Sequence, residues 1–228
     1  MSEITKTKYG LSYFRRADKN ITEIGVDESG RGPMFGRVYA AAVVLPKGSL
    51  IPFDDLRDSK KIKSFNKLSA ISEYIKQNAV AWSVCYEDEA MIDAVNIRQA
   101  TFSAMHRAIK NVELTFNKSE TEKIEILVDG NDFKPYMTMK KTMLVSIPHT
   151  CYEGGDNKFI SIAAASILAK TARDTYILKM CDEHPELKER YSIHTNKGYG
   201  TTKHMDGILE FGITPWHRKT YGICKTLM

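Results

Sequence analysis

The sequence predicts an α/β fold, a mixed sheet flanked by helices, with a small helical extension at the C-terminal end. Two observations lead to this prediction. Apolar runs with the alternation or the continuity of strands occupy residues 24–28, 38–45, 79–86 and 124–128. Stretches with apolar residues at helical spacing lie between and after these runs. An alanine-rich stretch over 160–174 could lie flat against a sheet because its side chains are small.

The size and composition are those of one large domain. The 228 residues are 43% hydrophobic, which is enough for a full core. The formal charge of +5 and the pI of about 8.9 are consistent with a polyanionic partner, although many ordinary enzymes are equally basic. We expect a basic N-terminal segment over 1–20, a main domain over 21–185 and the helical extension over 186–228.

The chain has the features of a soluble protein of the cytoplasm. Its four cysteines are far apart and form no CxxC pair, so we expect reduced, mostly buried thiols and no zinc knuckle. The N-terminal residues lack an apolar signal region, and no apolar run approaches the length of a membrane span. We therefore expect an intracellular location and no membrane partner.

The remaining elements are predicted from spacing and end signals. A helix carries Leu68 to Ile75 at helical spacing, and Asp58-Ser59 could cap it. A long helix with an apolar stripe opens at Glu87-Asp88-Glu89, since acids suit a helix N-terminus better than they suggest a second metal site. We also expect a short strand over 143–147, a turn over 151–158, and a helix over 202–211 that ends at Gly212.

The segment around Asp27 and Glu28 indicates chemistry. These two acids end the first strand, and in Gly30–Gly36, which follows, three glycines surround Arg31. Adjacent acids alone are usually a solvated strand edge, and Gly-Arg-Gly alone says little. Together they predict a metal ion beside a phosphate, because glycine lets the backbone come close to a bound group.

Two further acids follow strand-like or turn-like stretches. Asp129 ends the strand over 124–128 and is followed by Gly130, and ligands of open α/β sheets lie at the carboxyl ends of strands. Asp156 stands just before the alanine-rich helix, whose N-terminal amides and serines could meet a phosphate. The sequence thus offers four carboxylates for one site. The histidines have no metal-ligand spacing and are interpreted as packing or surface groups.

These motifs together resemble the ribonuclease HII family, the type 2 ribonucleases H. The resemblance covers roughly residues 22–222 and rests on Asp27–Pro33, on Val128–Asn131, on Gly155–Lys158 with the helix after it, and on Gly198–Gly200. Asp58–Lys61 matches a further family tetrapeptide. Ser29 replaces the alanine usual in the first motif.

The resemblance implies a ribonuclease H-like fold and a hydrolase that acts by two-metal-ion catalysis. It implies cleavage on the 5′ side of ribonucleotides in RNA–DNA hybrids and of single ribonucleotides in duplex DNA, and thereby a part in ribonucleotide excision repair and DNA replication. The cofactor would be Mg²⁺ or Mn²⁺. The residues implied are the catalytic and metal-binding Asp27, Glu28, Asp129 and Asp156 and the substrate-binding Gly30, Arg31, Gly32, Lys60, Ser161, Arg173 and Tyr199.

Three alternatives stay open. Ribonuclease HIII is a relative with an extra N-terminal domain and without this Gly-Arg-Gly form. A catalytically idle hybrid-binding protein is a second, although all four acids are present. A catalytic subunit that needs partner proteins is the third, and we expect instead a self-sufficient monomer.

Overall fold

The computed structural model describes residues 6–7, 9–15, 20–47, 62, 64–116 and 123–227. A five-stranded sheet with the order β3-β2-β1-β4-β7 forms its centre. Strands β1, β2 and β3 are antiparallel neighbours, whereas β4 and β7 run parallel to β1. The expected mixed sheet is therefore confirmed. The strands are β1 (Ile21–Ser29), β2 (Val38–Val44), β3 (Ala81–Glu87), β4 (Lys123–Asp129) and β7 (His149–Tyr152).

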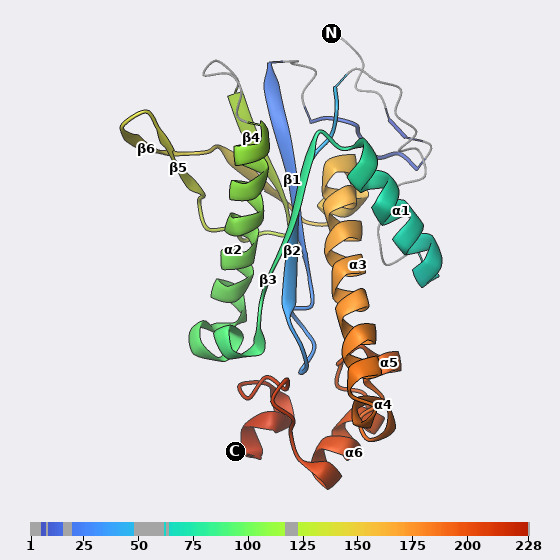
Figure 1. Cartoon of the computed structure of the whole chain (residues 1–228). Coiled ribbons are helices and arrows are strands. Elements are labelled where there is room, and N and C mark those ends of the chain that lie inside the picture. Colours follow the sequence, from blue (N-terminus) through green and yellow to red (C-terminus); the bar gives the residue numbers. More distant parts are fainter. Residues whose placement is uncertain are drawn as a thin grey trace.

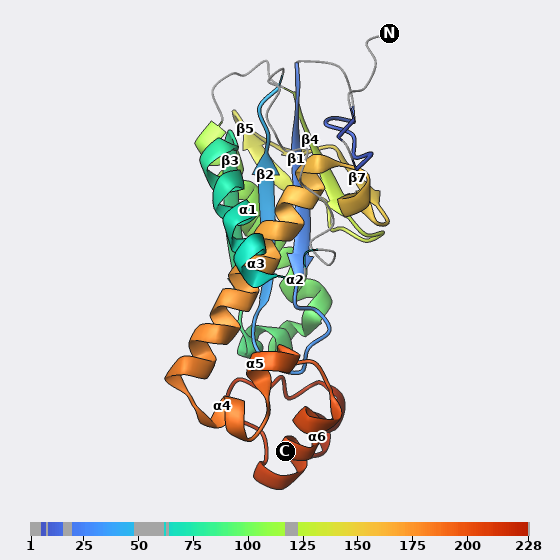
Figure 2. The same cartoon turned by 90° about the vertical axis from the view of Figure 1, so that its right-hand side faces the viewer.

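Helices cover both faces of this sheet. Figures 1 and 2 show α2 (Glu89–Phe116) on one face and α1 (Phe65–Asn78) with α3 (Ile160–Glu183) on the other. Alternate residues of β1 face opposite layers, as the period of a strand requires. Ile24 and Val26 pack with residues of α2, and Gly25 lies against α3.

The closest contact between sheet and helix is at Gly25. A Cβ atom placed on Gly25 would lie 2.2 Å from the carbonyl carbon of Ser161 and 2.6 Å from the backbone nitrogen of Ile162. No side chain fits at that distance, so only glycine lets the backbones of β1 and α3 meet here. The first turns of α3 are thereby held against the strand that carries Asp27.

Two sequence expectations about helices need correction. The long helix α2 is broken at Asn96, which has the non-helical angles φ 68° and ψ 162°. The Asn96 side chain accepts a hydrogen bond from the Gln99 N–H, so it acts as the N-cap of the second part. Met91 and Val95 of the first part are exposed, so the predicted apolar stripe is not fully buried there. Helix α1 is capped by Ser64, and Asp58-Ser59 lies outside the described residues.

The strand order also corrects the expectation for residues 143–158. The predicted short strand is β6 (Met143–Ser146), but it pairs with β5 (Met137–Lys140) in a separate hairpin. The fifth strand of the main sheet is β7, part of which we had expected to be a turn. Its four residues are all half-buried, so they lack the alternation that marks a strand.

The C-terminal elements pack against the turn between β1 and β2. They are α4 (Glu186–Glu189), α5 (Ile193–Asn196), α6 (Thr202–Phe211) and the 3-10 helix η4 (Gly222–Thr226). The 3-10 helix η3 (Gly155–Asn157), which precedes α3, contacts α3 and β4 instead. Helix α6 has the predicted bounds and ends at Gly212. Figure 1 shows this group below the sheet, beneath the turn that follows β1. Met34 and Phe35 share an apolar cluster with Ile177 and Ile208.

The cysteines agree with the expectation of mostly buried thiols. All four cysteines are free thiols, and Cys85, Cys181 and Cys224 are buried. Within the described parts of the chain, none of the helices has both the length and the apolar character needed to cross a bilayer.

Candidate active site

The acidic residues predicted from the sequence lie at one end of three neighbouring strands. β1 pairs in parallel with β4, with Val26 opposite Val128, so Asp27 and Asp129 follow side by side. β4 pairs in parallel with β7. Asp156 lies in η3, just beyond the end of β7. We call Asp27, Glu28, Asp129 and Asp156 the acidic edge.

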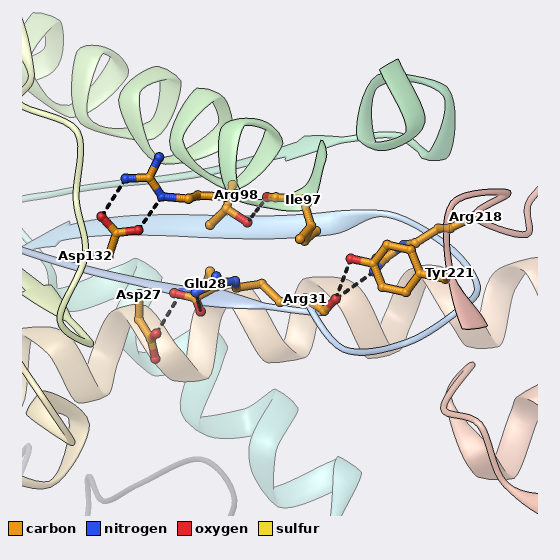
Figure 3. Close-up of polar contacts among 9 residues, drawn as sticks. Asp27, Glu28, Arg31, Ile97, Arg98, Asp132, Arg218 and Tyr221 are labelled. Carbon is orange, nitrogen blue, oxygen red and sulfur yellow. Dashed lines mark hydrogen bonds and ion pairs between the residues drawn. The ribbon is translucent and has the colours of Figure 1, made fainter. Parts of the chain in front are cut away.

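The pleat of β1 directs its two acids to opposite faces. Asp27 continues the Gly25 face and points toward α3, as Figure 3 shows, whereas Glu28 continues the face of Ile24 and Val26. The Asp27 side chain accepts hydrogen bonds from the Glu28 N–H at 2.7 Å and from Ser166 of α3. The sequence analysis assigned no function to Ser166.

The carboxylates of the acidic edge repel one another electrostatically. Burial raises the pKa of Asp27 well above its usual range, and the charges of Glu28 and Asp129 raise it further. Burial also raises the pKa of Glu28, the nearby Arg31 guanidinium lowers it, and Asp129 raises it. These carboxylates are close enough to repel one another electrostatically, so a bound cation would relieve their repulsion.

The other two acids are tied to η3 and its surroundings. Asp129 accepts a hydrogen bond of 2.6 Å from the Gly155 N–H, and Asp156, which is buried, accepts one of 2.9 Å from the Asn157 amide. In the part of the chain that the structure describes, no three His, Cys, Asp or Glu side chains stand as a ready-made metal site. The donor chemistry, all carboxylate oxygen, nevertheless fits a hard divalent cation.

The turn after β1, residues Gly30–Gly36, is the second part of the site, and we call it the glycine loop. Gly30 and Gly36 have φ angles of 100° and 83°, which favour glycine. One buried side chain, Arg218, donates hydrogen bonds to several carbonyls of this loop. Neither Arg218 nor Tyr221, whose hydroxyl also bonds the Arg31 carbonyl, was selected from the sequence. Their contacts span more than 180 residues of chain, which a local pattern cannot reveal.

Tyr199 lies beside the glycine loop, as the site hypothesis requires. Its side chain is half exposed, and a Cβ at Gly32 would be 3.4 Å from its ring. Gly198 has φ 81° and packs against Phe35, where a Cβ would lie 2.9 Å from that side chain. Arg31 is exposed and its guanidinium is 3.6 Å from the Glu28 carboxylate.

The remaining predicted contacts are placed differently. Ser161 and Arg173 are only 4% and 2% exposed. Arg173 donates a 2.5 Å hydrogen bond to the Lys197 carbonyl and lies against Gly30, so it supports the glycine loop from inside. Lys60 lies outside the residues that the structure describes.

An ion pair borders the acidic edge on the α2 side. Arg98 follows the break in α2 and binds Asp132, with 2.5 Å between Nε and Oδ2 and 2.9 Å between Nη2 and Oδ1. Figure 3 shows this pair at the left of the view, near Asp27, whereas Arg218 and Tyr221 lie at the right, near Arg31. It ties the loop after β4 to α2, because Asp132 follows Asp129 by three residues.

Two of the six histidines, His204 and His217, form a packed pair rather than a metal site. The Nε2 atoms of His204 and His217 are 3.0 Å apart, and both side chains are buried. His204 Nδ1 faces the Tyr199 carbonyl at 3.0 Å, and the Thr214 N–H donates to His217 Nδ1. Burial lowers the pKa of both, that of His217 to about 3, so both rings are neutral.

The mixed sheet with helices on both faces has the ribonuclease H-like fold. A crystal structure of ribonuclease H2 from Pyrococcus horikoshii OT3 matches with a TM-score of 0.70 at 19% identity, covering 90% of this chain and 96% of that one. Bst-RNase HIII in complex with Mn²⁺ matches with a TM-score of 0.62 at 15% identity, covering 84% and 70%.

Sequence comparison makes the assignment more specific. The model of the family described as ribonuclease HII matches residues 24–224. Ribonuclease HII of Phocaeicola vulgatus is 40% identical over 211 residues, covering 92% of this chain and 93% of the relative. The chain belongs to the ribonuclease HII family, and it is a type 2 ribonuclease H endonuclease.

Proposed function

We propose that this enzyme cuts the phosphodiester bond on the 5′ side of ribonucleotides, in RNA–DNA hybrids and at single ribonucleotides in duplex DNA. The proposal rests on one observation above the others. The parallel register of β1 and β4 sets Asp27 beside Asp129, directly before the glycine loop. A carboxylate cluster can hold cations against a phosphate, and a glycine-lined backbone can approach the neighbouring sugar.

The acidic edge supplies the groups for two-metal-ion catalysis. Asp27, Glu28, Asp129 and Asp156 would hold Mg²⁺ or Mn²⁺, which when bound neutralise the phosphate and lower the pKa of the attacking water. Ser166 and the Gly155 N–H orient Asp27 and Asp129 through their hydrogen bonds. The mutual repulsion of the acids favours cation binding. We expect cation binding to be weak until a substrate phosphate adds ligands. The Mn²⁺ complex of Bst-RNase HIII is consistent with a hard divalent cation.

The glycine loop and Tyr199 supply recognition of the ribose. A 2′-hydroxyl is both a donor and an acceptor, and only RNA carries it. The Arg31 carbonyl accepts two hydrogen bonds, from Arg218 and Tyr221. The Gly32 N–H belongs to the same planar peptide unit and points the opposite way, so it can be offered to a bound group. Tyr199 stacks behind the sugar, and the exposed Arg31 side chain meets a phosphate. Lys60, Ser161 and Arg173 are proposed as further phosphate contacts, the last two after a movement that exposes them.

A cleavage-site map tests the proposal. Purified protein is incubated with a DNA duplex that contains one ribonucleotide, with an RNA–DNA hybrid and with an all-DNA duplex, in Mg²⁺ and separately in Mn²⁺. We expect one nick on the 5′ side of the single ribonucleotide, leaving 3′-hydroxyl and 5′-phosphate ends, and several cuts in the hybrid. The all-DNA duplex stays intact. Failure to nick with either metal contradicts the proposal.

The same assay separates the alternatives. A catalytically idle hybrid-binding protein would retain the hybrid in a mobility-shift gel and cut nothing. A subunit that needs partners would cut only after other proteins were added. Sedimentation of the free protein tests the expected monomer.

A further inference from the structure

We propose that Arg218 is a positioning residue that fixes the glycine loop in the shape that recognises ribose. The inference rests on the proposed function and deepens it, because it assigns the geometry of the recognition loop to a residue from the far end of the chain. Arg218 touches neither metal nor substrate in this proposal; it acts through the backbone of Gly30–Gly36.

The hydrogen bonds of Arg218 are concentrated on this one loop. Nη2 donates to the Gly30 carbonyl at 2.6 Å, and Nη1 donates to the carbonyls of Arg31 at 3.0 Å and Pro33 at 2.7 Å. Nε donates to the Gly36 carbonyl at 2.8 Å. A planar guanidinium has donors fixed in a fork, so four acceptors bound to it have little freedom relative to one another.

Burying the charge of Arg218 costs folding free energy, so its presence here needs a functional explanation. Arg218 has no exposed surface, and burial lowers its pKa to about 10. Among the described residues, no carboxylate forms an ion pair with it, so the charge is balanced mainly by carbonyl dipoles. A buried charge of this kind is rarely the most stable choice, since apolar packing often replaces it without loss. The buried charge of Arg218 is explained if its function is to fix the shape of the glycine loop.

The backbone around Arg218 adds further contacts to the same loop. Phe35 and His217 form an antiparallel bridge, in which the Gly36 N–H donates to the Trp216 carbonyl and the Arg218 N–H donates to the Met34 carbonyl. The Tyr221 hydroxyl donates to the Arg31 carbonyl at 2.9 Å. Figure 3 shows Arg218 and Tyr221 converging on that one oxygen.

A second contact fixes the segment that carries Arg218. The Asp93 carboxylate accepts hydrogen bonds of 2.9 Å from the N–H groups of both Lys219 and Thr220. Asp93 belongs to the part of α2 before the break at Asn96. The segment is therefore held from α2 on one side and holds the glycine loop on the other.

The consequence for recognition concerns the polar groups that the loop can present. Four of its carbonyls are directed to Arg218, and the Arg31 oxygen is saturated by two donors. The N–H groups of Met34 and Gly36 are bound to the carbonyls of Gly198 and Trp216. The N–H groups of Arg31 and Gly32 share peptide units with the fixed carbonyls of Gly30 and Arg31, so they point away from Arg218 in a fixed order, which suits a 2′-oxygen and a phosphate. If Arg218 were lost, carbonyls would be free to turn, and the preference for ribose over deoxyribose would fall.

The main experiment measures this preference in Arg218→Lys, which keeps the charge and loses the fork. Binding of duplexes with one ribonucleotide or none is measured by fluorescence anisotropy in Mg²⁺, in an Asp129→Asn background that prevents cleavage. We expect the ratio of the two dissociation constants to fall about tenfold, and in the cleaving enzyme KM to rise more than kcat falls. Arg190→Lys is the matched control, because Arg190 is exposed and stacks on Phe211 away from the loop.

Tyr221→Phe keeps the test valid if Arg218→Lys does not fold. It removes one hydroxyl that donates to Arg31, and the ring can stay in place. We expect a two- to threefold fall in the ratio, about the effect of one net hydrogen bond. Hydrogen exchange of residues 30–36, followed by mass spectrometry on free protein, gives a readout without substrate. We expect at least tenfold faster exchange in Arg218→Lys.

The outcomes separate this inference from the proposed function. Unchanged exchange in residues 30–36 and an unchanged ratio in folded variants would overturn the positioning inference while wild-type cleavage stood. The opposite result is also possible: hydrogen exchange in residues 30–36 is faster in Arg218→Lys, but the wild type cuts no ribonucleotide-containing duplex. That result would retain the positioning inference and overturn the proposed function.

Discussion

Asp27 and Glu28 of the acidic edge lie just before the glycine loop in the sequence, yet the internal energies of the two regions differ. In the acidic edge, burial and like charge raise the pKa values of Asp27 and Glu28, so the free protein holds these groups at a cost. In the glycine loop, the carbonyls of Gly30, Arg31, Pro33 and Gly36 all have a donor. In the proposed mechanism a cation completes the acidic edge, whereas the glycine loop is complete before any ligand arrives.

This difference suggests a division of work within the proposed mechanism. A preorganised loop loses little conformational entropy on binding, so it can discriminate ribose from deoxyribose. The acids gain most of their favourable interactions only when cation and phosphate are present. Their charge therefore contributes to catalysis at the scissile bond rather than to recognition of the sugar. Mutations in the two regions should therefore give different signatures, and the following predictions are ordered from the largest expected effect to the smallest.

Asp129→Asn should remove cleavage and spare binding. The change deletes one charge from the acidic edge and keeps an oxygen that can accept the Gly155 N–H. We expect kcat to fall by about a thousandfold or more, because the step that depends on cation-held water loses a ligand. Dissociation constants for an RNA–DNA hybrid should change by less than about tenfold. Single-turnover cleavage and anisotropy measure the two quantities.

Asp27→Asn should behave in the same way in that assay. A variant of either acid that still cleaved near the wild-type rate would show that the acidic edge is not the reacting centre. Asp182→Asn is a matched control, because Asp182 is an exposed acid that pairs with Lys188 on the surface.

Gly25→Ala should damage the fold that supports the acidic edge. The added Cβ would lie 2.2 Å from the Ser161 carbonyl carbon, so β1 and α3 must separate. We expect a loss of about 3 kcal/mol or more, as for other overpacked or strained core sites. Thermal and urea unfolding measure it.

Gly32→Ala is the matched change in the glycine loop. Its Cβ would be 3.4 Å from the Tyr199 ring, an ordinary contact, and its backbone needs no positive φ. Stability should change by less than about 0.5 kcal/mol, while KM for a ribonucleotide-containing duplex rises. Equal loss of stability in both variants would contradict the distinction between the two regions.

How much could be read from the sequence differs between the regions in the same way. The four acids and the glycines follow strands or precede a helix, so local patterns found them. The fold class followed from strand alternation and from the alanine-rich helix. The assignment to ribonuclease HII followed from motif order, and the comparisons confirm it.

The features that escaped prediction depend on contacts between distant residues. Arg218 appears in the sequence as one more cation, and its four acceptors are backbone atoms more than 180 residues away. The break at Asn96 interrupts a continuous helical pattern without proline or glycine, so spacing gave no sign of it. Strand β7 is recognisable only from its partner β4, because its own four residues show no alternation.

Acidification should weaken the support of the glycine loop through the buried histidines. The folded protein keeps His217 neutral, with a pKa of about 3 against an ordinary 6.5, so below pH 6.5 the unfolded chain binds more protons. Stability is therefore fully present above pH 6.5 and declines as the pH falls toward 3. A single such histidine predicts a loss of about 1.5 kcal/mol between pH 7.5 and 5.5.

Urea unfolding across that pH range in wild type and His217→Gln measures the histidine contribution. The variant should be less stable at pH 7.5 and show a smaller dependence on pH, with His204, whose pKa is also lowered, supplying the remainder. An equal slope in both proteins would exclude His217 as the source.

Asp27→Asn should raise stability even as it removes activity. The folded-state pKa of Asp27 lies above its unfolded value, so ionisation at neutral pH costs folding free energy, and this cost disappears below the unfolded pKa. A neutral amide removes the repulsion from Glu28 and Asp129 and can keep the contact with Ser166. We expect a higher Tm at pH 7, with each kcal/mol appearing as about 2–4 °C, and a gain that vanishes near pH 3.5.

Adding Mg²⁺ or Mn²⁺ should reverse this ranking, because a ligand that binds the folded state stabilises it in proportion to its affinity. Wild-type Tm should rise with metal concentration, and that of Asp27→Asn should rise less, so the two curves converge. A wild-type protein that was more stable than Asp27→Asn without metal would mean that Asp27 is already compensated by other groups. The acidic edge would then resemble the glycine loop, a region complete before its ligand binds.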